Sequence, residues 1–249
     1  VGFKRRDAAS AEAALKYVIY GGVASGVMLF GLSLLYGLTG ATEFTTVRTA
    51  LAAGGAAQLP ILIFAVVCVM AGFGYKVASV PFHMWVPDVY EGAPTPITAF
   101  LSVGPKAAGF ALLLRFFASG TGAVPDDAQL LGVPWAVLLG VISAATMTLG
   151  NLSAILQNNI KRLLAYSSIA HAGYLLMAMC VFSPAGEAAI MFYLVVYLLM
   201  NLGAFIVVIG FSEAGVGETI ESYRGLGKRA PMVAAIMGIF LFSLTGLPP

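Results

Sequence analysis

Long apolar stretches, separated by short polar or glycine-rich connections, run along the whole chain. A helix of about 20 apolar residues is needed to cross the hydrocarbon core of a bilayer, and the stretches reach that length. We predict seven spans, at about 13–36, 59–90 (broken), 97–117, 133–154, 163–182, 188–211 and 232–249 (incomplete). The pattern therefore indicates an all-α membrane protein, a polytopic helical bundle in which residues 1–249 form a single transmembrane domain.

The second apolar stretch is too long for one straight span. From Leu59 to Tyr90 it would extend roughly 48 Å as a helix, against about 30 Å of hydrocarbon. Pro81 and Pro87 both lack the backbone N–H that a helix interior needs. We therefore predict a broken helix in this span, with Lys76 near its midpoint, just before the break.

Two lysines lie inside otherwise apolar segments, and they are the main candidates for function. Placing a lysine in hydrocarbon costs about 3 kcal/mol of free energy on insertion scales, so a lysine at such a position indicates a functional role. Lys106 is one residue from the centre of the third span, directly after Pro105 and beside the small residues Ser102 and Gly109. We predict that Lys76 and Lys106 are buried and carry protons. For Lys76 the alternative is a side chain that reaches the lipid headgroups.

Two further features concern the connections and the later spans. The elbow GAPTPIT contains Pro94 and Pro96 and is expected to be non-helical, whereas the glycine- and threonine-rich segment 37–58 is expected to be a surface loop with at most a short amphipathic piece. Polar side chains share one face in the fifth and sixth spans: Ser167, His171 and Tyr174 in the fifth, and Tyr193, Tyr197 and Asn201 in the sixth. For His171 both a proton-relay role and a structural role remain open.

Composition excludes several classes of protein. Hydrophobic residues make up 60% of the chain and charged residues 10%, whereas soluble domains have about 45–50% and 25%. A nucleic-acid partner is therefore not expected, while the lipid bilayer is. Cys68 and Cys180 are far apart without a C-x-x-C spacing, and the two histidines fit no metal-ligand spacing. We expect no metal, no cofactor and no redox centre in this chain.

Charged residues predict the orientation of the bundle. If the N-terminus is cytoplasmic, one group of basic residues lies inside: Lys4, Arg5, Arg6, Lys16, Lys161, Arg162, Arg224, Lys228 and Arg229. Arg48 and Arg115 then lie outside, as the positive-inside rule favours. Glu12 and Lys16 are expected to form an i,i+4 ion pair. The acidic connection with Asp88 and Glu91 is expected either to form a cytoplasmic mouth near both lysines or to be an ordinary solvated loop.

Three sequence runs carry a resemblance to a known family. They are KVASVPFHMWVPDVYEGAPTPITAFLSVGPKAAGFALLLR, GNLSAILQNNIKRLLAYSSIAHAGYLL and SYRGLGKRAPMVAAIMGIFLFSLTGLPP. Together they resemble subunit N of the bacterial proton-translocating NADH-quinone oxidoreductase, respiratory complex I, within the antiporter-like membrane subunit family. The similarity covers essentially the whole chain.

The resemblance implies a fold of about 14 helices with two inverted repeats, each containing one broken helix. This chain would be an internal fragment of it, with a partner glutamate upstream of Val1 and a terminal lysine beyond Pro249. Lys76 matches the lysine of the broken helix, Lys106 matches the lysine that links two half-channels, and His171 lies on the helix of the central hydrophilic axis.

The resemblance also implies an activity and its partners. Protons would be moved across the bacterial inner (plasma) membrane, driven by electron transfer from NADH to quinone in other subunits of complex I. NADH, flavin, iron–sulfur clusters and quinone would bind those partner subunits, and none would bind this multi-pass chain. Two alternatives remain: a subunit of a multisubunit cation/proton antiporter, and a non-transporting scaffold of the membrane arm.

Overall fold

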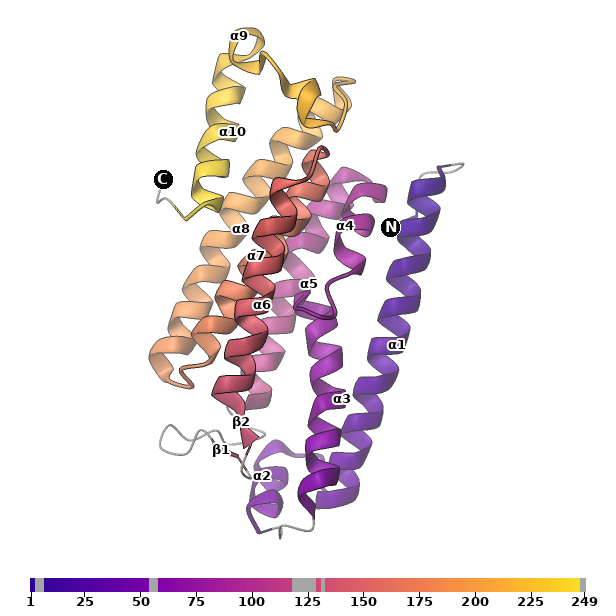
Figure 1. The fold of residues 1–249 in the computed structure, drawn as a ribbon, viewed down its shortest axis with the longest axis vertical. Coiled ribbons are helices and arrows are strands. Elements are labelled where there is room, and N and C mark those ends of the chain that lie inside the picture. The colour runs from indigo at the N-terminus through magenta and orange to yellow at the C-terminus, as the bar shows by residue number, and fades with distance from the viewer. Residues whose placement is uncertain (3–6, 54–57, 118–128, 131–132, 247–249) are drawn as a thin grey trace.

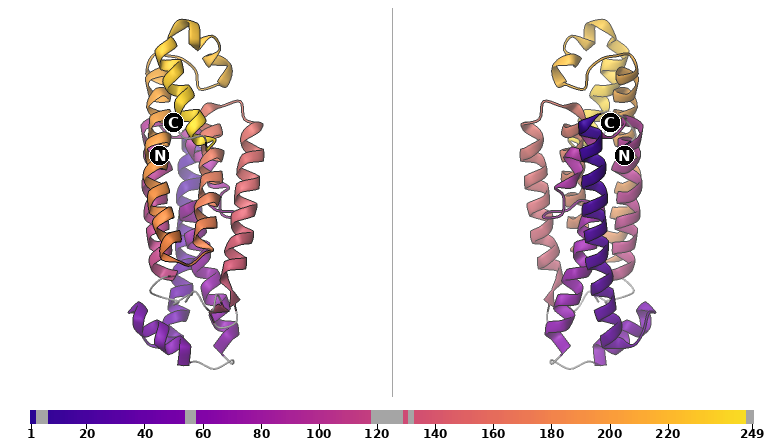
Figure 2. Two further views of the ribbon diagram at one scale, coloured as in Figure 1. Left: turned by 90° about the vertical axis from the view of Figure 1, so that its left-hand side faces the viewer. Right: turned by 90° about the vertical axis from the view of Figure 1, so that its right-hand side faces the viewer.

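The structure is a computed structural model that describes residues 1–2, 7–53, 58–117, 129–130 and 133–246 (Figure 1). Its elements are α1 (Ala8–Thr39), α2 (Phe44–Ala53), α3 (Leu59–Val77), α4 (Trp85–Gly92), α5 (Thr95–Arg115), β1 (Gln129–Leu130), β2 (Val133–Pro134), α6 (Trp135–Ile155), α7 (Ile160–Met179), α8 (Pro184–Glu213), the 3-10 helix η3 (Ile220–Tyr223), α9 (Leu226–Arg229) and α10 (Pro231–Leu244). The long helices run side by side in one bundle (Figures 1 and 2). Apart from the antiparallel pair β1–β2, the described elements are helical, which confirms the predicted all-α class.

Each predicted span coincides with a helix to within a few residues, counting α3 and α4 together as the broken one. Five helices of the described part are long and apolar enough to cross a membrane: α1, α3, α5, α6 and α8. Helix α7 is not among them because it carries Lys161, Arg162 and His171. The apolar helix α10 is shorter, with 14 described residues.

Segment 37–58 is not only loop. Helix α2 occupies Phe44–Ala53, so the helical piece allowed for in the prediction is present, and residues 54–57 lie outside the described part. Helix α2 and the end of α5 lie at one end of the bundle, whereas α9 and the start of α7 lie at the other (Figure 1). The basic residues of these elements are therefore divided between the two ends as the charge pattern predicts. Lys4, Arg5 and Arg6 lie outside the described residues.

The predicted break lies between α3 and α4. Helix α3 ends at Val77 because Ala78 adopts the left-handed conformation (φ 64°), with its N–H directed at the last-turn carbonyls of α3. Pro81 lies within the break, after a cis peptide bond. Pro87 does not, and here the prediction was wrong: it is in the first turn of α4, where a missing N–H costs little.

Two side chains form hydrogen bonds with backbone groups at the break. The Val80 N–H donates to Thr146 Oγ1 of α6 at 3.1 Å, and Trp85 Nε1 donates to the Tyr75 carbonyl at 3.2 Å. The Val80 N–H is thereby satisfied, and the Tyr75 carbonyl, which also accepts from the Ala78 N–H at 3.3 Å, gains a second bond. His83 Nδ1, within the break, is buried without a hydrogen-bond partner among the described residues.

The elbow between α4 and α5 is shorter than predicted. Helix α5 already begins at Thr95, with Pro94 at its N-cap position and Pro96 as its second residue. The expectation that this whole segment is non-helical was wrong, because proline is tolerated in the first helical turn. Pro105 lies inside α5, which continues through it.

Helix α7 is the central element of the bundle. Thirteen of its 20 residues are buried, and it packs against α4, α5, α6 and α8. Glycines allow α6 and α7 to approach closely: a Cβ on Gly150 would lie 2.6 Å from the Ala170 nitrogen, and one on Gly173 would lie 2.6 Å from Met147 Cγ. Polar side chains on α7 are thereby held at the centre of the protein.

Candidate functional site

Lys106 is buried at the centre of the bundle, as predicted, with 2% of its surface exposed. Its Nζ donates to the backbone carbonyl of Ser168 and to the Ser168 hydroxyl, with an Nζ–Oγ distance of 2.5 Å. The Tyr197 ring centroid is 5.8 Å from Nζ. Among the described residues no carboxylate pairs with this ammonium. Because burial disfavours the charged form of an unpaired lysine, Lys106 is suited to release and regain a proton.

Ser168 joins three helices at this point. It belongs to α7, bonds Lys106 of α5, and accepts a hydrogen bond from the Tyr197 hydroxyl of α8 at 2.9 Å. The helical pattern of the sequence pointed instead to Ser167, which is only half-buried. The two serines are adjacent, so periodicity alone could not decide which of them faces α5.

His171 lies on α7, three residues after Ser168, and is 2% exposed. Its Nδ1 is 2.6 Å from the Tyr193 hydroxyl, and its ring centroid is 5.1 Å from that of Tyr197. The structure thus brings Lys106 and His171 into one buried polar cluster, linked through Ser168 and Tyr197.

Lys76 departs from its prediction. It lies in the last turn of α3, directly before the break, as predicted, but its side chain is exposed. The expectation of burial was therefore wrong for the described part of the chain. Its ammonium is 5.8 Å from the ring centroid of the adjacent Tyr75. Its Cβ lies beside Gly109 of α5, but the described residues leave the rest of the side chain uncovered, whereas its neighbours Tyr75 and Val77 are buried.

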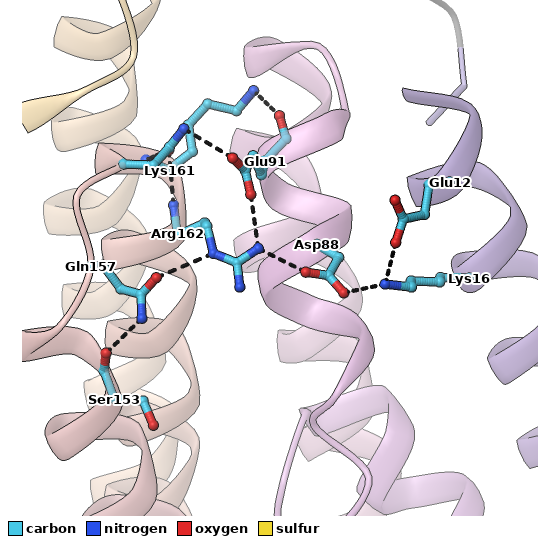
Figure 3. Close-up of polar contacts among 9 residues, drawn as sticks. Glu12, Lys16, Asp88, Glu91, Ser153, Gln157, Lys161 and Arg162 are labelled. Atoms are coloured by element: carbon cyan, nitrogen blue, oxygen red, sulfur yellow. Dashed lines mark hydrogen bonds and ion pairs between the residues drawn. The ribbon is translucent and has the colours of Figure 1, made fainter. Parts of the chain in front are cut away.

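A network of ion pairs lies at the end of the bundle where α4 and α7 meet (Figure 3). Arg162 Nη1 contacts Asp88 Oδ1 at 2.7 Å and Glu91 Oε2 at 2.8 Å. Lys16 Nζ of α1 contacts the other oxygen of Asp88 at 2.5 Å and Glu12 at 2.5 Å. The predicted pair of Glu12 and Lys16 is confirmed. The two acidic residues belong to helix α4 and not to a loop: Asp88 is paired with Lys16 on one side and Arg162 on the other, and Glu91 is paired with Arg162.

Lys161 was missed as a candidate by the sequence analysis. Its side chain is fully buried, and Nζ donates to the carbonyls of Glu91 (2.6 Å) and Ala93 (2.9 Å) and to Glu218 Oε1 (3.1 Å). These carbonyls lie at the C-terminal end of α4, where a cation complements the helix dipole. Lys161 therefore fastens α4 and the segment before η3 to the start of α7. No sequence signal marks these contacts, because the partners are far apart in the chain.

A metal site is not formed by the described residues, since no three His, Cys, Asp or Glu side chains among them converge. The candidate site is thus the buried cluster of Lys106, Ser168, Tyr197, His171 and Tyr193.

Comparisons with known proteins identify relatives of this chain. A relative named NADH-quinone oxidoreductase subunit N 2, from Sorangium cellulosum, is 59% identical over 254 residues, covering 100% of this chain and 50% of the relative. The chain spans about half the length of the curated relatives it matches.

Two solved structures show a similar fold. Respiratory complex I from Thermus thermophilus with bound aureothin contains a chain with 36% identity and a TM-score of 0.76, matched over 99% of this chain and 51% of that one. The Mrp complex from Dietzia sp. matches in fold alone, at 24% identity and a TM-score of 0.84, over 97% of this chain and 43% of that one. All of residues 1–249 match the family described as NADH:quinone oxidoreductase/Mrp antiporter, TM. The chain therefore belongs to the NADH:quinone oxidoreductase/Mrp antiporter transmembrane family.

Proposed function

We propose that this chain is part of a proton-translocating membrane subunit of an NADH-quinone oxidoreductase, with Lys106 as a central proton carrier. The names of its relatives support this assignment, among them subunits N at 59% and 58% identity. In this proposal the chain carries no redox centre or cofactor. NADH, flavin, iron–sulfur clusters and quinone are bound by partner subunits, with which it lies in a bacterial inner membrane.

The burial of Lys106 against neutral oxygens carries the proposal. A lysine that serves only to hold a structure together is expected to have a carboxylate partner or to reach water, because an unpaired buried charge is costly. Lys106 has neither among the described residues. A side chain whose charged form is poorly stabilised can change its protonation state at a small free-energy cost, as a proton carrier must.

The surrounding side chains supply a path for the proton. Ser168 Oγ lies between Lys106 Nζ and the Tyr197 hydroxyl, so one hydroxyl group connects α5 with α8. The ring of Tyr197 packs against that of His171, whose Nδ1 meets the Tyr193 hydroxyl. Hydroxyl and imidazole groups both donate and accept protons, so these side chains are suited to passing one along wherever a hydrogen bond joins them. The Tyr197–His171 contact is between rings, so the proposed path needs a bound water molecule to bridge these two side chains.

Lys76 has a different place in the proposal. It lies directly before the helix break, with an exposed ammonium that a carboxylate from outside the described residues can approach. An approaching carboxylate stabilises the charged form of a lysine, and a departing one destabilises it. We infer that Lys76 is loaded and unloaded in this way, ahead of Lys106.

The test is Lys106→Ala in the complete protein within its assembled complex. Inner-membrane vesicles are used to measure NADH-driven proton uptake and NADH:quinone electron transfer, and the amount of assembled complex is measured alongside. We expect proton uptake per electron to fall, with at least about a tenfold loss in the flux through this subunit, because a positioned proton carrier is removed. Lys228→Ala is the matched control, because Lys228 is exposed on α9.

Full proton uptake by an assembled Lys106→Ala complex would contradict the proposal and favour the non-transporting scaffold. The antiporter alternative makes a different prediction: transport by the unmodified protein would require sodium or another cation. Proton uptake that is unchanged when sodium is omitted supports the proposed function over that alternative.

A further inference from the structure

In the side-chain amide of Asn201, the nitrogen has a hydrogen-bond partner among the described residues and the oxygen has none. Asn201 is on α8 and fully buried, and its Nδ2 donates to Ser102 Oγ at 2.5 Å. The Ser102 hydroxyl donates its own proton to the Ala99 carbonyl at 2.7 Å, so Ser102 can only accept from Asn201. This fixes which end of the amide is the nitrogen. The oxygen, Oδ1, is buried without a hydrogen-bond partner among the described residues.

A buried acceptor without a donor is rare in folded proteins, because it has given up its bonds to water. Membrane interiors make this cost harder to avoid, since no bulk water can relieve it. The oxygen of Asn201 therefore indicates a donor that comes to it, whether a side chain in another position or a bound water molecule.

Lys106 offers that donor. Ser102 and Lys106 are at i and i+4 on α5, so their side chains lie on the same face, one turn apart. A lysine ammonium has three N–H groups, and Ser168 accepts two of them through its carbonyl and its hydroxyl. One N–H remains for another acceptor. The spare donor and the spare acceptor thus belong to side chains that lie next to Ser102.

The position of Tyr197 on α8 also places Asn201 close to Lys106. It precedes Asn201 by one turn on α8, and its hydroxyl bonds Ser168 Oγ while lying 3.4 Å from the Ser102 carbonyl. One face of α8 therefore presents a hydroxyl next to the Ser168 contact of Lys106 and an amide oxygen one turn further along.

We propose that Asn201 Oδ1 is a second hydrogen-bond acceptor for the Lys106 ammonium, reached directly or through one bound water molecule. Asn201 is then a positioning residue that stabilises the charged form of Lys106. The ammonium has a third N–H to donate to this oxygen, whereas the neutral amine does not. This inference rests on the proposed function, since it concerns how the proposed carrier holds its proton. It also accounts for the buried amide oxygen, which the Ser102 contact leaves unexplained.

The experiment compares Asn201→Asp and Asn201→Leu, each in the complete protein within its assembled complex, by the pH profile of proton uptake. Aspartate has the shape of asparagine but adds a negative charge beside the ammonium, and an opposite charge shifts such an equilibrium by one to three pH units. We expect the midpoint of the Asp profile to move to higher pH by at least about one unit. Leucine removes the acceptor, so we expect a shift to lower pH and about a tenfold loss of proton uptake.

Met200→Leu is the matched control, because Met200 is the buried neighbour of Asn201 that contacts Ser243 of α10 instead. A packing disturbance at this level of α8 would change stability in all three variants without moving the pH profile. If the Leu variant does not assemble, the pH profile of proton uptake in the isosteric Asp variant tests the proposal alone: an unshifted midpoint would overturn it.

Lys106→Ala, measured in the same vesicles, distinguishes failure of the role of Asn201 from failure of the proposed function. If Lys106→Ala loses proton uptake while the Asn201 variants keep the unmodified pH profile, the role of Asn201 is overturned and the proposed function stands. If Lys106→Ala retains full uptake, the proposed function itself fails.

Discussion

The stem of Lys76 lies against Gly109: a Cβ atom on Gly109 would be 3.3 Å from Lys76 Cβ and 3.1 Å from Val77 Cγ1. Gly109 is one turn after Lys106 on α5. The absence of a side chain at this position therefore lets the end of α3, just before the break, approach the helix that carries the buried lysine.

Gly109→Leu is expected to force α3 and α5 apart. Overpacking of this kind costs about 1–3 kcal/mol, and the displaced residues include Lys76 itself. We predict a lower thermal unfolding midpoint of the purified complex and a loss of proton uptake, measured by differential scanning fluorimetry and in vesicles. Gly210→Leu on α8 is the control, because a Cβ there meets nothing within 4 Å. Equal midpoints for the two variants would contradict the prediction.

Two glycines of α1 are expected to respond differently to the same substitution. A Cβ on Gly31 would be 2.5 Å from the Ala65 carbonyl of α3, whereas one on Gly26 would meet nothing within 4 Å. Gly31→Val should therefore separate α1 from α3 and lower the yield of assembled complex, and Gly26→Val should do so less. Quantitative immunoblots of membranes would show it, and a larger loss for Gly26→Val would mean that α1 packs by another face.

Arg162 and Asp88 are expected to act as one unit. Their side chains are 28% and 30% exposed, so the pair is worth only about 0.2–1 kcal/mol, but Arg162 also bridges Glu91. Because the two share one contact, the effects of Arg162→Gln and Asp88→Asn on the free energy of unfolding should not add.

A double-mutant cycle by thermal unfolding measures this coupling. The coupling should shrink in 1 M salt, where exposed charges are screened within about 3 Å. Arg162→Lys, which keeps the charge, should retain part of it. Full additivity at low salt would show that the network does not hold α4 to α7.

The contact of His171 with Tyr193 separates the two roles left open for the histidine. If the 2.6 Å contact is part of the proton path, Tyr193→Phe should lower proton uptake by at least about tenfold at normal assembly. The double variant with His171→Phe should then be no worse than His171→Phe alone, because both remove the same contact. Tyr20→Phe, at an exposed position of α1, is the control. Normal uptake by Tyr193→Phe would assign His171 a structural role.

Hydropathy and proline positions were enough to predict the spans and the break. Apolar length reports on the bilayer directly, and a proline acts on its own backbone, so both signals are local. The burial of Lys106 followed in the same way from its place at the centre of a span. The errors at Pro87 and Pro96 concern first helical turns, where local sequence is ambiguous about which side of a boundary a proline occupies.

Contacts between distant segments could not be predicted in this way. Ser168 is 62 residues from Lys106, Asp88 is 74 from Arg162, and Asn201 is 99 from Ser102. Periodicity places a side chain on a face but does not say which helix covers that face, and for this reason Ser167 was preferred to Ser168. Lys76 was expected to be buried because of its place near the midpoint of the broken span, and position along a span does not say which side of the helix is covered.

The sequence by itself determined which segments form long apolar helices, where one helix breaks, and that Lys106 lies at the centre of one of these segments. Only the tertiary structure decided which groups surround that lysine, that Lys76 is exposed, and that Lys161 and Arg162 fasten α4. The physical reason is that transfer into lipid depends on each segment's own composition, whereas a buried polar group depends on the neighbours that packing brings to it.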